Sequence, residues 1–173
     1  GEFEEAQGYI RSLHEAEAHS FSAVITGNAV IDAVLNAHHS SAQASGIDFS
    51  VTAQPLPDLT MGSWELSTLF SNLLENAREA CEKVKGREPW IEVKISVANR
   101  FLLLEIRNTS DSRPEEKEWK TTKREKQGHG LGLLSVEDIV EKYNGSLKRS
   151  CSEDGIVEVS VMCETISTIT DNN

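Results

Sequence analysis

Two asparagines and a glutamate recur at helical spacing near the middle of the chain. Asn72, Asn76 and Glu79 are four and three positions apart, so in a helix their side chains form one polar row. Beside this row, apolar residues from Leu66 to Val84 keep the spacing of a stripe packed on a core. Amide and carboxylate oxygens suit a hard cation such as Mg²⁺, which takes few protein ligands. Taken alone, the row favours the alternative, the solvated flank of an ordinary buried helix.

A glycine-rich segment later in the chain helps to decide between a cation site and a solvated flank. Gly128, Gly130 and Gly132 alternate with other residues directly before a helical pattern that continues to Tyr143. Glycines let the backbone approach an anion closely, and the N-terminus of the following helix supplies a positive end. By itself the segment is weak evidence, and an ordinary entry into a helix is the default interpretation. Combined with the asparagine row, it favours a site for a phosphate compound and its cation.

Together the two motifs resemble the N box and the second glycine box of the GHKL ATP-binding fold. Gyrases, MutL mismatch-repair proteins, heat-shock chaperones and histidine kinases share this fold. Residues 72–77, 26–36 and 121–123 are most similar to peptide-pheromone and citrate sensor kinases, and the resemblance extends from about residue 9 to residue 163. It implies the catalytic domain of a two-component sensor histidine kinase, a phosphotransferase that uses ATP and Mg²⁺.

The resemblance also implies roles for the asparagine helix. Asn76 matches the family residue whose side-chain oxygen holds Mg²⁺. Asn72 stands where the gyrase and chaperone branches have a glutamate that activates water, and an amide cannot take up a proton at neutral pH. Glu75 is a nearby carboxylate that could help to orient a nucleophile. We therefore expect a site that positions ATP without hydrolysing it efficiently, with a histidine on another helix as the nucleophile.

Further nucleotide contacts are implied outside this helix. Asn108 stands where most GHKL proteins have an aspartate that accepts a hydrogen bond from the adenine amino group. The neutral carbonyl of Asn108 can accept the same bond, but a weaker one, so we expect weak affinity for the nucleotide. The polar segment 109–127 is similar to the family's lid, from which Lys123 could reach phosphate oxygens, a solvated side chain being the open alternative. The implied nucleotide-binding residues are Asn76, Asn108, Lys123, Gly128, His129, Gly130, Leu131, Gly132 and Leu133.

Composition limits the classes of partner. The chain has 173 residues and a formal net charge of −11, which argues against a surface for nucleic acid or anionic membranes. No apolar run is long enough to span a bilayer, and three cysteines without metal-ligand spacing favour reduced thiols. The chain begins with Gly1 instead of methionine. We expect a soluble, cytoplasmic part of a longer protein, and a membrane-anchored parent stays open.

The order of the predicted elements indicates an α+β fold. Helices are expected near residues 28–46, 62–86 and 131–143, and strands near 47–53, 90–98, 101–107, 146–152 and 156–163. This order predicts a two-layer α/β sandwich, in which helices cover one face of a mixed, mainly antiparallel sheet.

By the same resemblance, the chain divides into unequal parts. We expect a fragment of a dimerisation helix at residues 1–20, the GHKL catalytic domain at 21–165 and a tail at 166–173. His14 and His19 lack the acidic-aromatic sequence that follows the family's phosphoacceptor histidine, so we expect them to face solvent. The phosphoacceptor helix is then expected upstream of this chain.

The implied partners are ATP, the upstream dimerisation and phosphoacceptor helices, a response regulator and a second copy of the full-length protein. Two other functions stay open on the same fold. One is a serine kinase of the anti-sigma type, and the other is an interaction module whose lid is switched by bound nucleotide. A histidine-bearing helix encoded directly upstream would separate the histidine kinase from both.

Overall fold

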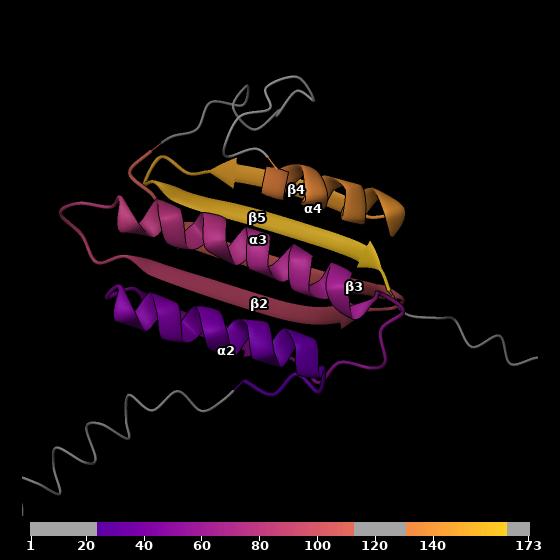
Figure 1. The fold of residues 1–173 in the computed structure, drawn as a ribbon. Helices are drawn as coiled ribbons and strands as arrows, with labels where there is room; N and C mark the ends of the chain where they lie inside the picture. The colour runs from indigo at the N-terminus through magenta and orange to yellow at the C-terminus, as the bar shows by residue number, and fades with distance from the viewer. Residues whose placement is uncertain (1–23, 113–130, 166–173) are drawn as a thin grey trace, which may run out of the picture.

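The computed structural model describes residues 24–112 and 131–165, which form a five-stranded sheet with three helices on one face (Figure 1). The helices are α2 (Ala29–Ala44), α3 (Ser63–Glu82) and α4 (Leu131–Lys142), and the strands are β1 (Asp48–Ala53), β2 (Trp90–Ala98), β3 (Phe101–Thr109), β4 (Ser146–Cys151) and β5 (Ile156–Glu164). The predicted two-layer α+β sandwich is confirmed. The dimerisation helix predicted at 1–20 and the tail predicted at 166–173 lie outside the described residues.

The sheet has the strand order β1-β2-β3-β5-β4. β1 is parallel to β2, and the other neighbouring pairs are antiparallel, as predicted. The predicted strands form two hairpins, β2–β3 and β4–β5, with Asn99 and Gly155 at positive φ in their turns. Because β3 is the middle strand, its C-terminal end is held from both sides, and Asn108 pairs with Ile91 of β2 and Val157 of β5.

The helix α3 lies over the middle of the sheet, between α2 and α4 (Figure 1). Most of the predicted apolar stripe is buried, whereas Ala80 and Val84 are only half-buried; the buried members are Leu66, Leu69, Phe70, Leu73, Leu74, Ala77 and Cys81. The helix ends at Glu82, earlier than predicted from Gly86. Lys83 N and Val84 N bond to carbonyls three residues earlier, which tightens the last turn and ends the α-helical pattern.

The helix α2 begins at a side-chain cap. Oδ1 of Asn28 accepts hydrogen bonds from the backbone N–H groups of Val30 and Ile31 at 3.1 and 3.2 Å. The hydroxyl of Thr26, two residues before the cap, donates to Asp32 Oδ1 at 2.7 Å. The α2 residues Ile31 and Leu35 are fully buried in the core between helices and sheet. In residues 24–112 and 131–165 no helix combines the length and hydropathy that crossing a membrane requires.

Candidate functional site

A cavity of about 350 Å³ lies between α3 and the adjoining ends of β3 and β5. Its polar lining from the helix consists of Asn76, Glu79 and Lys83. Its polar lining from the sheet side consists of Asn108, Ser110, Ser112 and Arg149. The fold therefore brings the predicted residues Asn76 and Asn108 to one space from different elements.

The rest of the cavity wall is apolar. Ala77 and Ala80 of α3 face Ile106 of β3 and Val157 and Val159 of β5 across it. The two alanines have short side chains, so the helix leaves room above the sheet at this point. A cavity with apolar walls and a few polar groups suits a flat heteroaromatic ring whose edge needs hydrogen-bond partners.

Asn108 is the most enclosed polar group of the cavity, with 2% of its surface exposed. Its Nδ2 donates a hydrogen bond to the backbone carbonyl of Thr109 at 2.9 Å. The contacts among the described residues include no donor to Oδ1. With Nδ2 engaged, Oδ1 is the atom through which Asn108 would meet a ligand, as a hydrogen-bond acceptor.

Asn76 and Asn72 lie in different surroundings although they are one helical turn apart. Asn76 is exposed and lines the cavity. Asn72 is half-buried and lies against the first turn of α4, where a Cβ built on Gly132 would come within 2.8 Å of Asn72 Oδ1. The asparagine row thus connects the cavity with the N-terminus of α4, the end of a helix at which anions are stabilised.

Glu75 lies beside the asparagine row of α3 but is turned away from the cavity, toward Arg78. Its carboxylate forms an ion pair with Arg78 and accepts a hydrogen bond from Arg78 Nε at 3.2 Å. This hydrogen bond lowers the pKa of Glu75 below its usual value, and the nearby charge of His38 on α2 adds to the effect. Glu75 is not among the residues that line the cavity. Its predicted role in orienting a nucleophile stays a prediction.

Two cations that line the cavity, Lys83 and Arg149, were not predicted from the sequence. Lys83 continues the row of Asn76 and Glu79 by one more turn, so the helical spacing could have identified it. Arg149 lies on β4, and its Nη2 is 3.2 Å from Glu137 Oε1 on α4. Nothing near Arg149 in sequence signals this position, because it depends on the pairing of β4 with β5.

Four of the predicted nucleotide-binding residues, Lys123, Gly128, His129 and Gly130, lie outside the described residues. Leu131, Gly132 and Leu133 form the first turn of α4. Within the two described ranges, no group of three or more His, Cys, Asp or Glu side chains is arranged to hold a metal ion.

Comparison with protein families and known proteins gives the relationships of this chain. The family described as GHKL domain matches residues 61–164. No curated protein has a significantly matching sequence.

Solved structures share the fold. The mycobacterial sensor histidine kinase MprB is 20% identical, with a TM-score of 0.61 over 80% of this chain and 95% of the other. The nucleotide-free catalytic domain of the histidine kinase ThkA is 20% identical, with a TM-score of 0.62 over 80% of this chain and 93% of the other. Full-length ShkA in complex with AMPPNP is 17% identical, with a TM-score of 0.67 over 86% of this chain and 32% of the other. At these identities the likeness establishes the fold.

Proposed function

The chain belongs to the GHKL domain family, and from this membership we propose that it is the ATP-binding catalytic domain of a sensor histidine kinase. In this proposal the γ-phosphoryl group of ATP passes to a histidine on a helix encoded upstream. The observation that carries the proposal is the cavity that Asn76 and Asn108 line together. The fold shared with histidine kinases supports this class over the serine kinase and the interaction module, which no observation favours.

The base of the nucleotide would occupy the sheet side of the cavity. There Oδ1 of Asn108 would accept a hydrogen bond from the adenine amino group, because Nδ2 already donates to Thr109. The ring would lie between Ala77 of α3 and Val157 of β5, which line the same cavity. Guanine carries a carbonyl oxygen where adenine has its amino group, so two acceptors would face each other. The proposal therefore includes a preference for adenine.

The phosphates would extend along α3 toward the N-terminus of α4. Asn76 fits Mg²⁺ because it is exposed, lines the cavity and offers an amide oxygen. A magnesium ion needs only one or two protein ligands when phosphates and waters supply the others. When bound, Mg²⁺ would neutralise negative charge on the phosphates. Lys123, Gly128, His129, Gly130, Leu131, Gly132 and Leu133 are retained as proposed contacts of the nucleotide.

Within residues 24–112 and 131–165, neither Asn72 nor Glu75 is an evident base for water. Asn72 has an amide in place of a carboxylate and is packed against Gly132. Glu75 has its carboxylate engaged by Arg78, so it would have to leave that pair to orient a nucleophile. A site of this kind favours transfer to an imidazole that already carries a lone pair over hydrolysis.

The proposed activity requires partners beyond this chain. A histidine on an upstream helix would be the acceptor, a second copy of the full-length protein would complete the dimer, and a response regulator would take the phosphoryl group onward. The parent protein would hold this domain in the cytoplasm, either free or attached to a membrane anchor.

The experiment uses the protein extended upstream through its predicted dimerisation hairpin, incubated with γ-labelled ATP and Mg²⁺. We expect acid-labile, alkali-stable label on the added segment, which is the behaviour of phosphohistidine. The chain without that segment is the control, and it should bind ADP without becoming labelled on His14 or His19. Label that resists acid would indicate a serine kinase, and rapid phosphate release would indicate an ATPase.

A further inference from the structure

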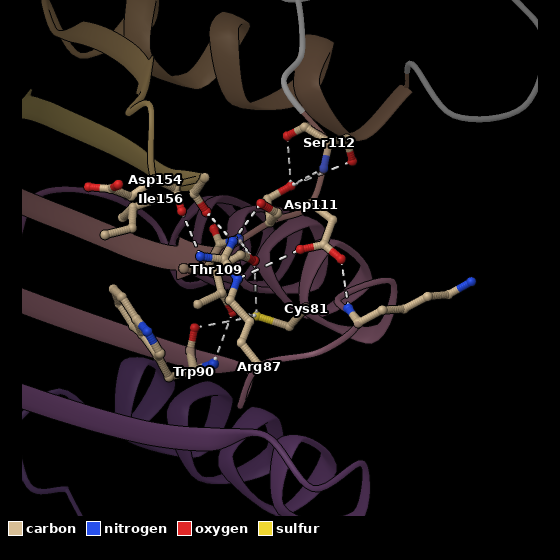
Figure 2. Close-up of polar contacts among 12 residues, drawn as sticks. Cys81, Arg87, Trp90, Thr109, Asp111, Ser112, Asp154 and Ile156 are labelled. Atoms are coloured by element: carbon tan, nitrogen blue, oxygen red, sulfur yellow. Dashed lines mark hydrogen bonds and ion pairs between the residues drawn. The ribbon is translucent and has the colours of Figure 1, made fainter.

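Arg87, in the loop between α3 and β2, joins two segments that are distant in sequence. Its Nη1 donates to the carbonyl oxygen of Asp154 at 2.6 Å, and its Nη2 donates to the carbonyls of Ser110 and Gly155 at 2.8 and 2.9 Å. Its Nε also lies 3.7 Å from Asp111 Oδ1. Figure 2 shows Arg87 between the end of β3 and the β4–β5 turn. One guanidinium therefore holds three backbone carbonyls from two segments.

The end of β3 and the β4–β5 turn also contact each other directly, next to Arg87. Ser110 N donates to the carbonyl of Gly155 at 2.8 Å, so both backbone groups of Ser110 are engaged. A Cβ on Gly155 would come within 2.4 Å of Ser110 O and 2.6 Å of Arg87 Nη2, and Gly155 has φ +69°. Asp111 Oδ2 accepts a hydrogen bond from Lys85 N at 2.6 Å. The loop that carries Arg87 is thus fixed at two points.

The segment that Arg87 holds is a wall of the cavity. The side chains of Asn108, Ser110 and Ser112 line it, and Ser110 is 3% exposed. The ladder pairs of β3 end at Thr109, so beyond that residue the sheet no longer fixes the backbone. Ser110 Oγ donates to the carbonyl of Ser112 at 3.0 Å, which closes a local turn but does not connect it to the rest of the fold. Arg87 reinforces the connection that Ser110 N makes to Gly155 O and Asp111 Oδ2 makes to Lys85 N, and it is the side chain that reaches Ser110 and the β4–β5 turn together.

A second set of contacts fixes Thr109 from the helix side. Trp90 N donates to Thr109 Oγ1 at 3.1 Å, and Cys81 Sγ lies 3.4 Å from the same oxygen (Figure 2). Burial raises the pKa of the Cys81 thiol, so it stays protonated and able to donate. Thr109 is therefore secured without Arg87. The effect of losing Arg87 should be confined to residues 110–112 and the turn of Gly155.

We propose that Arg87 is a positioning residue of the nucleotide site, which holds the Ser110–Ser112 wall in place against the adenine end of the ligand. The inference rests on the proposed function, since it requires that the cavity binds a nucleotide base. The three contacts to carbonyls carry it, because the Asp111 ion pair is long and partly exposed and such pairs contribute little. Arg87 itself does not line the cavity, so it acts through the backbone.

The test is Arg87→Met, which keeps the aliphatic stem and removes the guanidinium. Binding is measured by displacement of a fluorescent ADP analogue, with adenosine and with Mg²⁺-tripolyphosphate as competitors. We expect the Kd of adenosine to rise about tenfold, the effect of one charge-assisted hydrogen bond, and the Kd of tripolyphosphate to stay within about twofold. Arg87→Lys, which retains a cation but reaches fewer carbonyls, should recover part of the adenosine affinity.

The control is Arg100→Met at the opposite end of β3, where Arg100 Nε lies 3.3 Å from Glu164 Oε1. This variant also removes a guanidinium beside β3, and it should leave the affinities for adenosine and tripolyphosphate unchanged. Unchanged adenosine affinity in Arg87→Met, or equal losses for adenosine and tripolyphosphate, would overturn the inference. If Arg87→Met does not fold, Gly155→Ala replaces it, because this change disturbs the contacts among Arg87, Ser110 and Gly155. The same measurements then apply, the Kd of adenosine and the Kd of tripolyphosphate. Failure of the unaltered chain to bind ADP would instead contradict the proposed function.

Discussion

The side chain of Asn72 on α3 occupies the space beside Gly132 of α4 that a side chain at position 132 would need. A Cβ there would lie 2.8 Å from Asn72 Oδ1 and 3.2 Å from Asn72 Cγ. The glycine therefore lets Asn72 keep this position between two helices, in addition to any approach of its backbone to phosphate. The same contact places the N-terminus of α4 beside the asparagine row.

We expect Gly132→Ala to destabilise the chain by roughly 1–3 kcal/mol, the usual cost of adding a methyl group to a filled contact. Asn72→Ala should relieve most of this loss when the two changes are combined, because only the Cβ of residue 72 would remain, 3.7 Å away. Urea denaturation of the two single variants, the double variant and the unaltered chain measures this coupling. Additive losses would show that Asn72 turns aside freely and that the contact is unimportant.

The Gly132 contact also shows where sequence reasoning reached its limit. From the sequence, the alternating glycines were explained by the binding of a phosphate compound. In the structure Gly132 also contacts Asn72 of α3, a helix far away in the sequence. The apolar stripe of α3 and the turns at Asn99 and Gly155 could be predicted because they depend on local spacing and turn chemistry. Arg87 and Arg149 could not, because their contacts exist only once β5 lies between β3 and β4.

Glu75 illustrates a different source of difficulty. It was selected by resemblance, yet it is adjacent to Asn76, and neighbouring residues on a helix point about 100° apart. Glu75 is also three residues after Asn72 and four before Glu79, so helical spacing places it beside the row without deciding which way its side chain turns. In the structure it faces α2 and pairs with Arg78. The orientation of this side chain therefore follows from its contacts with Arg78 and α2, which neither the resemblance nor the spacing supplied.

Asn76→Ala should remove the Mg²⁺-dependent part of ADP binding. Titration calorimetry with and without Mg²⁺ is expected to show a loss of about tenfold or more in the presence of the metal, the range for a bond to a charged group. The thermal midpoint should be unchanged or slightly higher, because the residue is exposed and alanine favours the helix. Asn36→Ala on α2 serves as the control. Unchanged affinity with Mg²⁺ in a folded Asn76→Ala chain would exclude the metal-ligand role.

Asn108→Asp tests the orientation of the buried amide. The carboxylate would face the carbonyl of Thr109, which now accepts from Nδ2 at 2.9 Å, and residue 108 is 2% exposed. We expect a loss of about 2 kcal/mol at neutral pH in the absence of nucleotide, because a buried charge would lose its partner. The folded-state pKa of the new carboxyl would be raised, so the loss should diminish as the pH falls and the protonated group can donate to Thr109.

Chemical denaturation between pH 4 and pH 8 measures this effect of Asn108→Asp. The control is Asn36→Asp, because Asn36 Nδ2 also donates to a backbone carbonyl, that of Asp32, at 2.7 Å, but from a half-exposed position. Its penalty should be smaller, since water can solvate the new charge. Equal penalties at the two positions would mean that Asn108 is not held in the orientation described.

Glu65→Gln should lower the thermal midpoint at neutral pH, because Glu65 connects the start of α3 with the end of α4. Its carboxylate accepts from Lys142, from Tyr143 Oη at 2.7 Å and from Gly62 N at 3.1 Å. The Lys142 contact, followed by that of Tyr143, lowers the pKa of Glu65 in the folded chain. A carboxyl group of this kind contributes stability above its unfolded pKa and loses that contribution as the pH falls through its folded pKa.

The difference between Glu65→Gln and the unaltered chain should therefore be largest at neutral pH and diminish below about pH 4.5. Calorimetric scans of both chains at several pH values measure it. In a Lys142→Met background the same substitution should have a smaller effect, and a difference that is independent of pH would contradict the assignment.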